Sequence, residues 1–172
     1  MYKKYFSLLS LIIISTILTG CGGNSDLNSN VDVSNNPATL KQDLCAVFTP
    51  AEIGQIVGQT VTLKRGLLPQ TDAVQGCAYD VGDGRSINFI FYKNASDQES
   101  KTAFDSVLKT MGNQSKLTGL GDDAVYFESS VVTNLTTYQK NVFITMSSTI
   151  GKADQRMNNI KSLAGLIWSK LL

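Results

Sequence analysis

The sequence predicts an α+β domain over residues 41–172, in which three helices pack on one face of a mainly antiparallel sheet of about six strands. Three observations predict this two-layer sandwich. Three segments carry apolar residues at helical spacing, the segments between them alternate apolar and polar residues, and short turn sequences separate neighbouring strand segments. Consecutive strands joined by short turns favour antiparallel pairing.

The helices are indicated by their starts and ends. Thr49-Pro50-Ala51-Glu52 has the pattern of a capping box, and Gly58 is a typical helix end, so the first helix is expected over Pro50–Val57. A second capping pattern, Ser96-Asp97-Gln98-Glu99, opens a helix that ends before Gly112. A third helix with a broad apolar face is expected over Ala153–Leu171.

Strands are expected in six segments. These cover residues 60–64, 77–81, 86–92, 124–128, 131–138 and 142–147. Gly82-Asp83-Gly84 and Gln139-Lys140-Asn141 are predicted to turn two hairpins.

The first 20 residues have the three zones of a signal peptide. Lys3 and Lys4 precede an apolar run from Phe6 to Leu18, and Thr19-Gly20 supplies a small-residue end. The run of about 13 residues falls short of the roughly 20 that a membrane-spanning helix needs. Residues 1–20 are therefore predicted to be a cleaved leader, the alternative being an uncleaved membrane anchor.

The end of this leader, Leu18-Thr19-Gly20-Cys21, resembles the lipobox of bacterial lipoproteins. The resemblance implies cleavage before Cys21, diacylglycerol on its thiol and further acylation, with palmitate as a typical chain. Several acyl chains hold a protein on a bilayer effectively permanently. Gly22 follows the cysteine in place of the Asp that retains many such proteins at the inner membrane, which implies an outer-membrane anchor facing the periplasm.

Residues 22–40 are rich in Asn, Ser and Gly and lack a periodic apolar face. Such a segment buries too little apolar surface to order itself, so residues 21–40 are predicted to be the lipidated cysteine and a disordered tether. The alternative is a docking segment that uses Leu27, Val31 and Val33.

Cys45 and Cys77 are predicted to form a disulfide, because paired cysteines in an exported domain are normally oxidised. The alternative, a catalytic or metal-binding thiol pair, usually needs the closer Cys-x-x-Cys spacing.

The body also resembles small cell-envelope lipoproteins of unknown function. The resemblance rests on Cys45, Thr49-Pro50-Ala51-Glu52, Cys77-Ala78-Tyr79 and Gly119-Leu120-Gly121-Asp122. It implies a shared fold and no particular activity.

Composition excludes several classes of function. Histidine is absent, which removes Ser-His-Asp triads, Cys-His dyads and histidine metal sites. The chain has 15 basic and 14 acidic residues without a basic cluster, which argues against nucleic acid as a partner. Gly82-Asp83-Gly84 is too short for a phosphate-binding loop, and no cofactor or metal is predicted.

Three features are candidates for a site. Gly119, Gly121, Asp122 and Asp123 form a polar loop that is either a binding loop or a turn. Ser100-Lys101, Ser115-Lys116 and Ser169-Lys170 are possible catalytic pairs, although sequence neighbours on a helix do not face each other. An aromatic groove is a third candidate, formed by Phe48, Tyr79, Tyr92, Phe127 and Tyr138.

These observations predict a membrane-anchored, non-enzymatic module that binds an envelope protein or a cell-wall component. The first alternative is an immunity-type inhibitor of a periplasmic toxin. The second is a hydrolase that uses carboxylates or a Ser/Lys pair.

Overall fold

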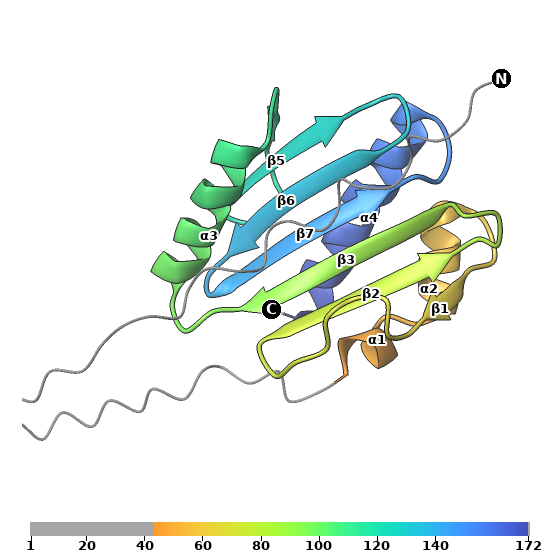
Figure 1. Ribbon diagram of the computed structural model, residues 1–172, viewed down its shortest axis with the longest axis horizontal. Helices are drawn as coiled ribbons and strands as arrows, with labels where there is room; N and C mark the ends of the chain where they lie inside the picture. The colour runs from red at the N-terminus through yellow and green to blue at the C-terminus, as the bar shows by residue number, and fades with distance from the viewer. Residues whose placement is uncertain (1–42, 172) are drawn as a thin grey trace, which may run out of the picture. The chain divides into compact units, whose positions relative to one another are not determined.

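The computed structural model describes residues 43–171, which form a seven-stranded antiparallel sheet with four helices (Figure 1). The α+β class is confirmed. The helices are α1 (Leu44–Val47), α2 (Pro50–Val57), α3 (Asp97–Thr110) and α4 (Ala153–Leu171). The strands are β1 (Thr62–Lys64), β2 (Val74–Asp80), β3 (Ser86–Lys93), β4 (Ser115–Leu117), β5 (Asp123–Glu128), β6 (Thr133–Gln139) and β7 (Val142–Ser148). The predicted leader, the lipidated Cys21 and the tether lie outside the described residues.

The strand order is β1-β2-β3-β7-β6-β5-β4. Two meanders, β1 to β3 and β4 to β7, therefore meet where β3 pairs with β7. Gly82 and Gly84 adopt positive φ in the β2–β3 turn, and Lys140 does so in the β6–β7 turn, so both predicted hairpins are confirmed. None of the helices within residues 43–171 is long and apolar enough to cross a membrane.

The predicted helix starts are confirmed by their caps. The Thr49 hydroxyl accepts from the Glu52 amide at 3.3 Å, and the Glu52 carboxylate accepts from the Thr49 amide at 3.0 Å. In α3 the Ser96 hydroxyl accepts from the Glu99 amide at 3.2 Å, whereas the Glu99 carboxylate accepts from the amide of Ala95. In a reciprocal capping box the Glu99 carboxylate would accept from the Ser96 amide, so the second cap differs from it by one residue.

Some predicted strands have different bounds in the structure. Residues 131 and 132 belong to a turn rather than to β6, because the Ser129 hydroxyl accepts from the amides of both Val131 and Val132. Strand β2 begins at Val74, before Cys77, and continues through Gly76. There the side chain of Leu68 lies directly against the glycine, where a Cβ atom would otherwise stand.

The prediction that three helices share one face of the sheet is wrong. Helices α1, α2 and α4 pack with the larger core cluster, which includes Phe89 and Ile144 (Figure 1). Helix α3 packs on the opposite face, where Phe104 contacts Val125 and Phe143. Helical periodicity predicts an apolar stripe but contains no information about which face of the sheet that stripe covers.

The predicted disulfide between Cys45 and Cys77 is present, with the two Cα atoms 5.5 Å apart. Both cysteines are buried, so the bond fixes α1 against β2 inside the core. Two hydrogen bonds reinforce this contact: the Tyr79 hydroxyl donates to the Phe48 carbonyl at 2.5 Å, and the Leu44 amide donates to Gln75 Oε1 at 2.8 Å.

Two cationic side chains hold α4 at its ends. The buried Arg156 guanidinium donates to Thr133 Oγ1 at 3.2 Å, to the Gly151 carbonyl at 3.0 Å and to the Ser129 carbonyl at 2.8 Å. Lys170 Nζ donates to Glu52 Oε1 at 2.6 Å and lies 5.4 Å from the centroid of the Phe48 ring. The hydrogen bond from Lys170, together with those from Thr49, lowers the pKa of Glu52 to about 2.

Removing the disulfide should destabilise the domain without changing its fold. Closing a loop of this length is worth about 3 to 4 kcal/mol in the chain-entropy model, so the double variant Cys45→Ser/Cys77→Ser should lose about that much free energy of unfolding. Urea unfolding of the full chain measures the loss. A reductant should lower the stability of the wild type to the level of the variant and leave the variant unchanged, whereas a loss below about 1 kcal/mol would contradict the estimate.

Candidate functional site

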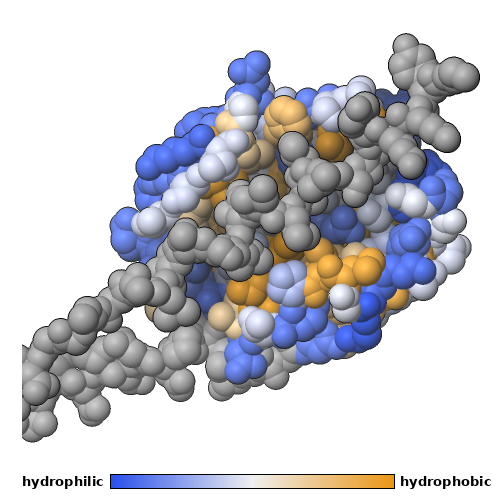
Figure 2. Space-filling model, viewed as in Figure 1, coloured by the Kyte–Doolittle hydropathy of each residue, from blue (hydrophilic) through white to orange (hydrophobic). Residues whose placement is uncertain are grey.

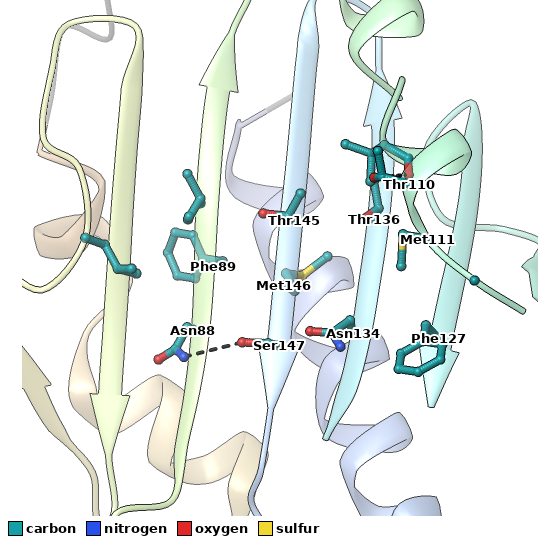
Figure 3. Close-up of a pocket in the computed structure, with 14 residues that line it drawn as sticks. Asn88, Phe89, Thr110, Met111, Phe127, Asn134, Thr136, Thr145, Met146 and Ser147 are labelled. Atoms are coloured by element: carbon teal, nitrogen blue, oxygen red, sulfur yellow. Dashed lines mark hydrogen bonds between the residues drawn. The ribbon is translucent and has the colours of Figure 1, made fainter. Parts of the chain in front are cut away.

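The face of the sheet that α4 does not cover contains a cavity of about 500 Å³, which we call the trough (Figure 3). Its floor is formed by β3, β7, β6 and the end of β5. One wall is the C-terminal end of α3, and Leu68 from the β1–β2 loop also lines the cavity. Figure 2 shows apolar surface gathered near the middle of this face. The volume lies in the usual range of small-ligand sites.

Strand register arranges the floor in two rows of side chains. The first row is Asn88, Ser147, Asn134 and Phe127, one residue from each of four neighbouring strands. The second row is Ile90, Thr145 and Thr136. Three strand spacings of roughly 4.8 Å make the first row about 14 Å long. These side chains share the trough because alternate residues of a strand point to the same face.

The floor presents hydrogen-bonding groups that are uncharged. Asn88 Nδ2 donates to Ser147 Oγ at 3.3 Å (Figure 3). Asn88 Oδ1 is buried and has no hydrogen-bond partner among the described residues. None of the described side chains that line the trough carries a charge. The site therefore offers amide and hydroxyl groups in surroundings with no ionic partner.

Apolar side chains around these groups are left without a place in the core. Leu68, Ile90, Met111 and Phe127 line the trough and belong to neither core cluster. These four side chains come from four parts of the chain: the loop before β2, strand β3, the end of α3 and strand β5, in that order. A ligand in the trough would remove their apolar surface from water.

The predicted loop over residues 119–123 is held by the β6–β7 hairpin. The Asp122 amide donates to the Tyr138 carbonyl at 2.8 Å, and the Asp122 carboxylate accepts from the Lys140 amide at 2.9 Å. Asp123 accepts from the Ala124 amide at 2.9 Å and pairs with Lys116 at 3.5 Å. The Asp123 carboxylate thus contacts the chain next to it, whereas the Asp122 carboxylate holds the β6–β7 turn. Within residues 43–171 no group of three or more acidic or cysteine side chains is placed to hold a metal ion.

The Ser-Lys pairs lie on separate elements with separate partners. The Ser100 hydroxyl is buried and accepts from Asn94, whereas Lys101 pairs with Asp105 at 2.7 Å. Ser115 and Lys116 lie on the edge strand β4. The Ser169 hydroxyl donates to a carbonyl of its own helix. The structure brings none of these three pairs into the trough.

The predicted aromatic groove is divided between the two faces of the sheet. Phe48 and Tyr79 are fully buried in the larger core cluster, and burial raises the pKa of Tyr79. Tyr92 and Tyr138 pack in the smaller cluster under α3. Phe127 alone of the five lines the trough.

Comparison of the chain with protein-family models, with curated proteins and with solved structures finds no match. The trough therefore has to be interpreted from its own residues. Sequence reasoning missed its floor, because alternation places Asn88, Thr145 and Asn134 on the polar sides of their strands, which are normally solvated. One signal in the sequence could have indicated the floor. These three residues lie next to apolar residues along neighbouring strands, and none of the three is charged.

The loop contacts predict a sharp difference between two glycines. Gly121 has a φ of 70°, and a Cβ atom there would meet the Tyr138 carbonyl and, at 2.7 Å, Thr137 Oγ1. Gly119 has a φ of 83°, but a methyl group there would meet no other atom within 4 Å. Gly119→Ala should cost about 1 kcal/mol from backbone strain, and Gly121→Ala about 3 kcal/mol from strain and collision. Urea unfolding of both variants checks this, and equal losses would mean that the loop does not depend on its contact with β6.

Proposed function

We propose that this protein is a membrane-anchored lipoprotein of the cell envelope whose domain binds a ligand in the trough. The observation that carries the proposal is the trough itself, an open region on a sheet whose opposite face is covered by three helices. The lipobox resemblance at residues 18–21 supports the anchor. The polar segment over residues 22–40 supports display of the domain away from the bilayer.

The chemistry of the trough favours binding over catalysis. General acid-base catalysis requires a group that exchanges a proton near neutral pH, and nucleophilic catalysis by serine requires a neighbouring base. The described lining contains Asn, Ser and Thr but no Asp, Glu, Lys, Arg or Cys. Ser147 is hydrogen-bonded to an asparagine amide, which cannot act as that base.

The anchor would keep the domain close to the membrane, where it would meet ligands of the cell envelope. A lipid-fixed domain on a tether of about 19 residues samples a shell of roughly 25 Å above the membrane. With Gly22 after the lipidated cysteine, we propose that this shell lies on the periplasmic side of an outer membrane. The ligand would then be an envelope protein or a cell-wall component.

The anchor can be tested by lipid incorporation. Cells supplied with radiolabelled palmitate should label the wild-type protein, and Cys21→Ser should abolish the label, because the modified thiol is removed. Gel autoradiography of the purified protein measures this. As a matched control, Cys45→Ser/Cys77→Ser should keep the label. Labelling of the Cys21→Ser protein, or a wild-type protein that still begins at Met1, would contradict the anchor.

The binding face can be tested by crosslinking in intact cells. A photoreactive amino acid in place of Thr145, which lies in the middle of the trough floor, should give a reproducible adduct after irradiation. The same amino acid in place of Asn158, which is exposed on α4, should not. Mass spectrometry of the adducts identifies what is bound. Absence of any adduct at position 145, or equal adducts at both positions, would count against the trough as the binding face.

A further inference from the structure

We propose that the trough binds a neutral oligosaccharide, an inference that rests on the proposed function and names the ligand class of that site. The charge of the lining is the first argument. Because none of the described lining side chains is charged, an anionic or cationic ligand would lose its hydration without gaining an ionic partner. The ligand that fits this surface is uncharged.

The arrangement of polar and apolar groups is the second argument. A pyranose ring carries hydroxyl or acetamido groups around its edge and apolar C–H groups on its faces. Asn88, Ser147 and Asn134 offer donors and acceptors along one row, and Phe127 ends that row with an aromatic side chain. Asn88 Oδ1 is buried without a partner among the described residues, so rotation of this side chain toward the trough would supply an acceptor for a ligand hydroxyl or amide.

The strand pairing argues against an extended peptide. Peptides that add to a sheet need an unpaired strand edge. The floor strands β3, β7 and β6 are each paired on both sides, so their backbone groups are already used. An apolar helix face is also disfavoured, because it would cover the polar side chains of Asn134 and Thr145 without offering them hydrogen bonds.

Calorimetric titration of the full-length protein tests the proposal. The protein should be held in a polyoxyethylene detergent, since a detergent with a sugar headgroup would compete. The ligands are tetra-N-acetylchitotetraose and cellotetraose, which are neutral, and the fully deacetylated glucosamine tetramer, which is cationic. We expect at least one neutral tetramer to bind and the cationic tetramer to bind about tenfold more weakly or not at all.

Two variants place the binding in the trough. Asn134→Ala should weaken binding about tenfold by removing one hydrogen-bonding amide, and Thr145→Arg should abolish it by filling the floor with a charged side chain. The matched controls are Asn158→Ala on α4 and Thr118→Arg in an exposed loop, which should bind as the wild type does. Thermal unfolding confirms that each variant is folded, and if Thr145→Arg is not, Asn134→Ala carries the test.

The outcomes separate this inference from the proposed function. Three outcomes would overturn the oligosaccharide proposal. They are no binding of either neutral tetramer at millimolar concentration, stronger binding of the cationic tetramer, and binding that the trough variants leave unchanged. If the saccharides fail but the crosslinker at position 145 gives a protein adduct, the ligand class is wrong and the binding module stands. If both experiments fail, the proposed function falls as well.

Discussion

The structure depends on the register between the two central strands, β3 and β7. Phe89 lies opposite Met146 and Phe91 opposite Ile144, and all four side chains point into the core beneath α4. The residues that alternate with them, Asn88 and Ile90 in β3, necessarily point to the other face, opposite Ser147 and Thr145. A shift of one residue would exchange the two faces and expose the largest apolar side chains. The core and the trough therefore both result from the alternation of side chains between the two faces of β3 and β7.

The position of α3 explains why only part of the second face is open. Along the same strands, Tyr92, Phe143 and Tyr138 form a row of aromatic side chains, and Phe104 of α3 packs on it with its ring centroid 5.0 Å from that of Tyr138. The next two rows consist mainly of amides and hydroxyls. An apolar helix over them would bury polar groups at a cost, so the helix covers the aromatic row and leaves the polar rows as the floor of the trough.

The covered face holds that floor in place. The disulfide fixes α1 to β2, Lys170 joins the end of α4 to α2, and the guanidinium of Arg156 satisfies three acceptors around the start of α4. The buried charge of Arg156 is compensated by these three hydrogen bonds from its guanidinium. These contacts fix the helix layer at both ends of α4, beneath the strands that form the floor. For the ligand proposed above, a preformed floor would reduce the free energy lost to ordering on binding.

Local signals in the sequence predicted the elements, and long-range geometry decided the rest. The helices expected at about Pro50–Val57 and about Ala153–Leu171 are present with these bounds, because caps and apolar periodicity are encoded within the helix itself. Helix α1 and strand β4, with four and three residues, are too short to show a period.

The face that α3 covers depends on residues far apart in sequence, so periodicity could not predict it. For the same reason the polar sides of β3, β6 and β7 looked like ordinary solvated surface. The difference is that Met111 and Leu68 form walls beside this polar surface, and those walls exist only once the chain is folded.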